Sequence, residues 1–186
     1  METLRSLDRQ QPRCFLHADY HLGNLFFDAD GKAGVLDWQS ICQGPWSHDF
    51  TYFLVSALDL ANRRDWEGPL LRYYLEQLVQ HGVSPPSLAD AWQHYIRQIV
   101  YGLYYWLVNP VEFHVEVNNC AVAPRFALAA LDHGTRERLC HRGTKDVGLF
   151  VVPRMAHMHN FAGTRGLLWE RFVHWSYSIA RERAGG

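Results

Sequence analysis

The sequence contains little lysine, no clustered basic residues and no long apolar run. Lys32 and Lys145 are the only lysines among its 18 basic residues, and the formal net charge is -1. Proteins that track a phosphate backbone need clustered cationic side chains, so we expect no nucleic-acid partner. No apolar stretch approaches the roughly 20 residues that cross a bilayer, so we also expect no membrane insertion.

The cysteines form no C-x-x-C pair, and the first residues lack the basic and apolar blocks of a secretion signal. We therefore expect a reducing, cytoplasmic environment. The length of 186 residues is enough to bury a core without disulfide or metal staples. The four cysteines are Cys14, Cys42, Cys120 and Cys140.

Short apolar runs broken by polar turns open the chain. Residues 14–16, 25–27 and 34–36 have the length and composition of strands. The turn-forming segment 28–31, Asp-Ala-Asp-Gly, separates the second run from the third, which predicts a β-hairpin.

Helical periodicity begins at Asp49, which we expect to cap the helix that follows. The overall prediction is an α+β fold, mostly helical with one short hairpin. Aromatic residues recur at helical spacing in the helix predicted at 88–107, and we favour core packing for them over a ligand platform. Further helices are predicted at 66–80, 88–107, 121–133 and 164–181, and a strand at 147–152. The aromatic residues are Trp92, Tyr95, Tyr101, Tyr104, Tyr105 and Trp106.

Two acids and an amide follow the first predicted strand in an order that suits phosphoryl transfer. Asp19 and Asn24 lie five positions apart on one loop, and Asp37 ends the next hairpin. Such chemistry needs a carboxylate near the attacking hydroxyl and oxygen ligands for Mg²⁺ on the phosphates. Each acid taken alone is equally typical of a turn former or a helix cap.

The order His17 to Asn24, then Asp37-Trp38, then Gly44 with Asp49 resembles the aminoglycoside phosphotransferase and choline kinase-like family, over about residues 13–134. The resemblance implies the C-terminal lobe of a kinase-like fold that moves the γ-phosphate of ATP to a small hydroxyl compound. It makes Asp19 the catalytic base and His17 a loop-ordering residue of the catalytic site. Asn24 and Asp37 become the Mg²⁺ and nucleotide ligands, and Asp49 a structural brace.

One residue of this loop departs from the family pattern. Ala18 stands where the family usually has glycine, and its methyl group would distort the loop if the backbone there needs a positive φ.

A kinase of this kind also needs a lobe that covers the nucleotide, and the residues before the loop are too few to form it. We therefore expect an absent N-terminal lobe, a truncated chain with little or no activity alone, and a division into residues 1–134 and 135–186. The missing lobe implies a second chain or a homo-oligomer as partner. Alternatively, the chain is a non-catalytic lobe that acts as a binding fragment. The acceptor stays open among aminoglycosides, choline, homoserine, sugars and related alcohols.

The tail, about residues 141–182, resembles the C-terminal end of certain α/β-hydrolases. That resemblance implies His159 as a triad histidine, and a hydrolase remnant as a further alternative. However, the sequence contains no G-x-S-x-G nucleophile motif. His157 and His159 are therefore also explained as turn histidines.

Overall fold

The computed structural model describes residues 9, 11–108 and 116–135. The chain divides into two units, Met1–Leu139 and Cys140–Gly186, and every described residue belongs to the first. This unit is α+β and mostly helical, as predicted. Its strands are β1 (Arg13–Leu16), β2 (Leu25–Phe27), β3 (Ala33–Val35) and β4 (Cys42–Pro45), and its α-helices are α2 (Ser47–Ala57), α3 (Leu60–Gln80), α4 (Leu88–Val108) and α5 (Glu116–Asp132).

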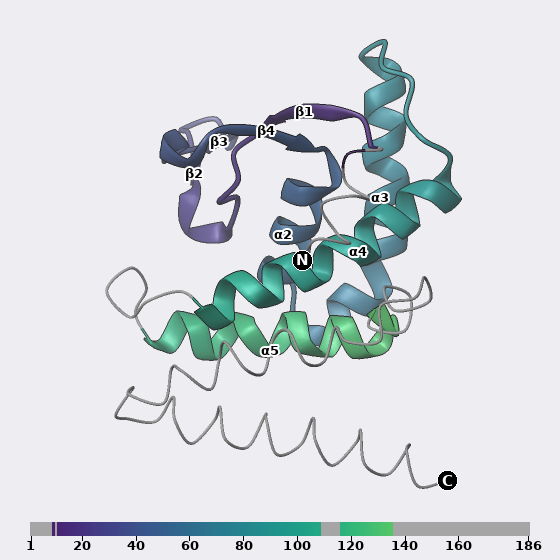
Figure 1. Cartoon of the computed structure of the whole chain (residues 1–186). Coiled ribbons are helices and arrows are strands. Elements are labelled where there is room, and N and C mark those ends of the chain that lie inside the picture. The colour runs from purple at the N-terminus through teal and green to yellow at the C-terminus, as the bar shows by residue number, and fades with distance from the viewer. Residues whose placement is uncertain (1–8, 10, 109–115, 136–186) are drawn as a thin grey trace, which may run out of the picture. The chain divides into compact units, whose positions relative to one another are not determined.

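The strands form two separate antiparallel pairs. β2 pairs with β3, which is the predicted hairpin, and β1 pairs with β4. The fourth strand was not predicted, because Cys-Gln-Gly-Pro has no alternation of apolar and polar residues and ends in proline. Its position matters, since it brings the chain back beside β1, with Pro45 opposite Arg13, and α2 then begins at that end of the strand pair (Figure 1).

The hairpin turn between β2 and β3 is held by one aspartate. Oδ1 of Asp28 accepts hydrogen bonds from the backbone N–H groups of Asp30 and Lys32, at 3.0 and 2.8 Å. Gly31 adopts a φ of 77°, which glycine reaches without steric cost. The turn chemistry predicted for residues 28–31 is confirmed.

Two helices begin earlier than predicted. α3 begins at Leu60 rather than at residue 66, because Asp59 caps it by accepting a hydrogen bond from the N–H of Asn62. The early start of α3 was not predicted because its first turn contains polar residues and shows no clear apolar periodicity. α5 likewise begins at Glu116 rather than at residue 121, whereas α4 matches its predicted range closely.

The core lies where α2, α4 and α5 meet, with α2 between the strands and the other two helices (Figure 1). α4 and α5 approach closely because Gly102 has no side chain, and a Cβ there would collide with the ring of Phe126. The aromatic residues of α4 divide: Tyr95 and Trp106 are buried in the core as predicted, whereas Tyr105 is exposed.

A buried ionic network joins α3, α4 and α5. The Arg63 guanidinium donates to Glu67 at 2.6 Å and also contacts Asp132. Glu67 accepts a further hydrogen bond from the Tyr95 hydroxyl at 2.7 Å, and its other oxygen lies 3.0 Å from the His133 ring. Buried charges are tolerated only when they are paired in this way, so the network fixes the relative positions of the three helices.

The elements predicted at 147–152 and 164–181 lie outside the described residues. Among the described helices, none has both the length and the apolar character required to cross a membrane.

Candidate active site

The loop after β1 holds the backbone of Asp19 at both of its polar groups. Its N–H donates to Nδ1 of His17 at 3.3 Å. Its carbonyl oxygen accepts from the N–H of His21 at 3.1 Å and from Nδ2 of Asn24 at 2.9 Å. The loop therefore has one defined conformation around Asp19.

Asp49 joins this loop to α2. Its Oδ2 accepts a hydrogen bond from the N–H of His17 at 2.6 Å, and its Oδ1 accepts one from the N–H of Ala18 at 3.0 Å. The expected helix cap is wrong, because Trp46 is the N-cap residue of α2 and Asp49 lies in the first turn. The carboxylate is directed at the loop instead of at the N–H groups of its own helix.

The backbone of Ala18 is strained. Its φ is 65°, in the left-handed region where a Cβ crowds the neighbouring carbonyl. The sequence left open whether a positive φ is needed at this position, and the structure shows that it is. The N–H of Ala18 and that of its neighbour His17 both donate to Asp49, and these two hydrogen bonds hold the strained turn in place.

A second connection fixes the position of Asp37. Leu36 donates its N–H to the carbonyl of Asn24 at 2.8 Å, and its carbonyl accepts from the His17 ring at 2.7 Å. Because Nδ1 of His17 accepts from Asp19, its ring hydrogen must be on Nε2, which donates to Leu36. Asp37 follows Leu36 directly, with a left-handed φ of 59° that aspartate tolerates better than most residues. The next residue, Trp38, packs on the His17 ring, with the two ring centroids 4.8 Å apart.

Asn24 and Asp37 provide hard oxygen donors on adjacent backbone segments. Nδ2 of Asn24 donates to a carbonyl, which fixes the orientation of the amide, and no described residue donates to its Oδ1. Asp37 is exposed, and its Oδ2 accepts only a long, 3.3 Å hydrogen bond from Gln39 within the described residues. Mg²⁺ is commonly held by one or two protein oxygens together with substrate phosphates, so this donor set fits that ion. The described residues contain no cluster of three or more His, Cys, Asp or Glu side chains able to hold a metal by themselves.

Two residues that the sequence analysis did not assign contact the Asp19 carboxylate. The hydroxyl of Tyr52 lies 3.5 Å from Oδ1 of Asp19, and Nε2 of His21 lies 3.7 Å from the same oxygen. Tyr52 is on α2, three positions after Asp49, so helical spacing places both residues toward the loop. That spacing was the available sequence signal.

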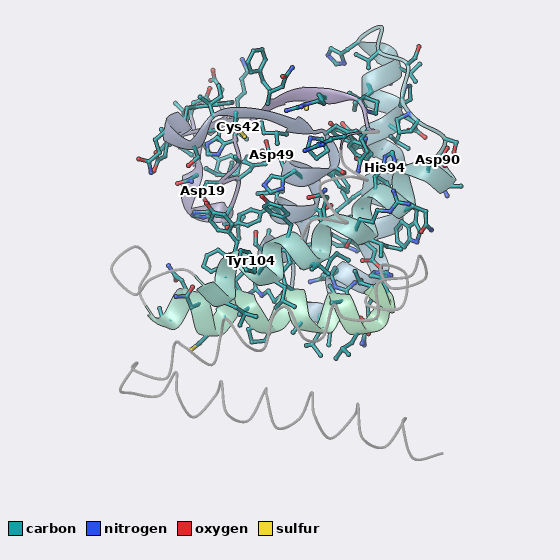
Figure 2. The ribbon with its side chains drawn as sticks, viewed as in Figure 1. Asp19, Cys42, Asp49, Asp90, His94 and Tyr104 are labelled. Atoms are coloured by element: carbon teal, nitrogen blue, oxygen red, sulfur yellow. The ribbon has the colours of Figure 1, made fainter. Side chains whose placement is uncertain are left out.

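Figure 2 labels both acids, Asp49 on α2 and Asp19 on the loop after β1. The structure thus brings five of the predicted residues to one loop and its supports: His17, Asp19, Asn24, Asp37 and Asp49. His159, the residue assigned by the hydrolase resemblance, lies outside the described residues, and no comparison with known proteins supports that resemblance.

A family model described as the phosphotransferase enzyme family matches residues 2–93. The matched segment contains the loop after β1, both strand pairs and α2. No curated protein and no solved structure matches the chain. The segment spanning residues 2–93, with the loop geometry described above, belongs to the phosphotransferase enzyme family.

Proposed function

We propose that this chain carries the catalytic-loop half of an ATP-dependent phosphotransferase that acts on a hydroxyl group of a small molecule. The observation that carries the proposal is the anchoring of Leu36 to the loop through both its N–H and its carbonyl. This anchoring supports a shared site for Asn24 and Asp37 on the loop that also presents Asp19.

In the proposed reaction Asp19 is the base. Its carboxylate orients the acceptor hydroxyl and accepts the hydroxyl proton as the oxygen forms its bond to the γ-phosphorus and the bond to the ADP oxygen breaks. The three backbone hydrogen bonds of Asp19 support this role, since they hold its Cα in place. His17 orders the loop through both ring nitrogens, and Asp49 braces it from α2.

Asn24 and Asp37 are the residues that would hold Mg²⁺ and, through it, the nucleotide phosphates. When bound, the metal would neutralise phosphate charge. The open Oδ1 of Asn24 and the exposed carboxylate of Asp37 support this assignment. We place the reaction in the cytoplasm, where ATP and reduced cysteines are expected.

A lobe that covers the nucleotide would come from another polypeptide segment, from a second chain or from a second copy. An apolar surface on the strands and their connections supports this part of the proposal, because large exposed apolar areas mark interaction sites. Phe15 is 82% exposed and Phe27 is 68% exposed. The other exposed members of this surface are Leu22, Phe26, Leu36, Trp38 and Ile41.

The same surface favours one second candidate function, a non-catalytic kinase-like lobe that binds a partner. The two candidates differ at Asp37, because a lobe that only binds a partner has no requirement for a metal ligand there. The phosphotransferase proposal does not assign the identity of the acceptor alcohol.

Calorimetric titration of the purified chain with Mg²⁺-ATP tests the proposal. We expect binding in the parent chain, and a loss of at least about tenfold in affinity in Asp37→Asn, because one charged oxygen ligand is removed. Asp30→Asn is the matched control, since Asp30 lies on the exposed hairpin turn, and it should bind as the parent does. Equal binding by the parent and Asp37→Asn, or no binding by either, would contradict the metal site.

A further inference from the structure

The contacts on the two oxygens of the Asp19 carboxylate are unequal. Both described side chains that approach it do so at Oδ1: the Tyr52 hydroxyl at 3.5 Å and Nε2 of His21 at 3.7 Å. Nδ1 of His21 accepts a hydrogen bond from the N–H of Gly23, so its ring hydrogen is on Nε2, facing Asp19. Two donors therefore face one oxygen, and no described side chain donates to Oδ2.

Tyr52 is fixed in place by the core. It is 3% exposed, and its ring lies 6.3 Å from that of Trp106, 5.8 Å from that of Phe126 and 6.4 Å from that of Tyr105. A phenol held on three sides by other rings has few rotamers available, so its hydroxyl remains directed at the loop.

The electrostatic surroundings of this hydroxyl favour its neutral form. Burial raises the pKa of Tyr52 well above its usual range, and the neighbouring charge of Asp19 raises it further. The hydroxyl consequently keeps its hydrogen and remains a donor at physiological pH. Such contacts are often long before substrate binds and shorten in the reactive complex.

We propose that Tyr52 is a positioning residue for Asp19: its hydroxyl holds Oδ1 from the core side, so that Oδ2 is presented to the acceptor hydroxyl. The inference rests on the proposed role of Asp19 as base. It adds a residue of α2 to the site and assigns separate roles to the two carboxylate oxygens. Asp49 and Tyr52, three positions apart on α2, would then support the loop backbone and the base respectively.

The alternative is that Tyr52 only fills the core. Removing the hydroxyl leaves the ring in place, so Tyr52→Phe separates the two roles. Tyr105→Phe is the matched control, because Tyr105 packs edge-on against Tyr52 and is 42% exposed, without a contact to Asp19 in the described residues.

The test is the χ1 rotamer of Asp19, measured by NMR through three-bond couplings to its carboxyl carbon, in the full chain without nucleotide. We expect one rotamer in the parent and in Tyr105→Phe, and averaged couplings in Tyr52→Phe. Averaged couplings in the parent would overturn the proposal without any variant, and so would a fixed rotamer in a folded Tyr52→Phe chain.

Nucleotide binding separates this inference from the proposed function. Tyr52→Phe should keep Mg²⁺-ATP affinity within about twofold of the parent, because Tyr52 contacts neither Asn24 nor Asp37. A chain that binds no nucleotide would defeat the proposed function, whereas the rotamer measurement would still report whether Tyr52 holds Asp19.

Discussion

The carboxylate of Asp49 accepts a hydrogen bond from the backbone of His17 at 2.6 Å, across 32 positions of the chain. Its second oxygen accepts from the next residue, Ala18. One side chain of α2 therefore satisfies two consecutive N–H groups of the loop that carries Asp19. These two bonds make the loop conformation dependent on the docking of α2.

Removing this carboxylate should release the loop. Asp49→Ala leaves two partly buried donors without their charged acceptor, so we expect a loss of about 2–3 kcal/mol in the free energy of unfolding. Hydrogen exchange should also become faster at the amides of His17 and Ala18. As a control, Asp90→Ala should cost about 1 kcal/mol, because among the described residues its side chain is hydrogen-bonded to Ser87 at the start of α4. Unchanged exchange at His17 and Ala18 in Asp49→Ala would show that the brace is not needed.

The strain at Ala18 predicts a stabilising substitution. A left-handed backbone costs a non-glycine residue roughly 1–2 kcal/mol, and glycine removes that cost from the folded chain. Glycine also has greater conformational freedom in the unfolded chain, which cancels part of this stabilisation. Ala18→Gly should therefore raise the free energy of unfolding by about 0.5–1 kcal/mol, measured by urea denaturation. Ala121→Gly, in the exposed part of α5, should lower it by about 1 kcal/mol. A destabilised Ala18→Gly would contradict the strained conformation.

Two glycines should respond to alanine to different extents. Gly102→Ala forces a methyl group against the Phe126 ring between α4 and α5, so we expect a loss of about 1–3 kcal/mol. Gly68, inside α3, has no atom within 4 Å of its would-be Cβ apart from its chain neighbours and the backbone of its own helix, but Pro69 follows it and disfavours a helical residue that carries a Cβ. Gly68→Ala should therefore change the free energy of unfolding by less than about 0.5 kcal/mol, because the higher helix propensity of alanine offsets this clash. Thermal unfolding of both variants measures the difference. Equal effects would mean that α4 and α5 are farther apart than the structure indicates.

The buried network predicts an acid-sensitive fold. Burial alone would raise the pKa of Glu67, but hydrogen bonds from His133 and Tyr95 and the charge of Arg63 outweigh it, and the net pKa is lowered from 4.5. A lowered pKa means that the unfolded chain binds more protons than the folded chain. The contribution of Glu67 is therefore present above about pH 4.5 and is lost as the pH falls through the folded value.

Glu67→Gln tests this linkage. Removing a partner from a buried charged network costs about 3 kcal/mol, so the variant should be less stable than the parent at pH 7. The two stability curves should converge as the pH falls through the lowered pKa of Glu67 in the folded chain, because the parent then loses the same interaction. Glu76→Gln, at an exposed position of the same helix, should follow the parent throughout. Parallel curves for Glu67→Gln and the parent would contradict the assignment.

The sequence predicted the fold class, the hairpin and the α4 range because these follow from local patterns. Asp28 and Gly31 are typical turn residues, and apolar residues recur at helical spacing along α4. The partner of β1 was not predictable in the same way, since β4 is defined by long-range pairing rather than by its composition. The early start of α3 was missed because its capping residue, Asp59, precedes a polar first turn.

The same distinction applies to the site. The motif predicted which residues belong to the site, but the direction of the Asp49 carboxylate depends on how α2 docks against the loop. Local helix chemistry alone favoured Asp49 as the N-cap of α2, which is wrong. The contact of Tyr52 with Asp19 likewise depends on packing against Trp106 and Phe126, which no local pattern encodes.

The most direct test of the central claim is to locate the metal. Mn²⁺ in place of Mg²⁺, added with ATP to the isotope-labelled chain, broadens NMR signals close to its binding site. We expect selective loss of the Asn24 side-chain amide and the Asp37 backbone signals, with the Asp90 signals retained and the effect abolished in Asp37→Asn. Broadening that is absent at Asn24 and Asp37, or unchanged in Asp37→Asn, would contradict a metal-nucleotide site on this loop.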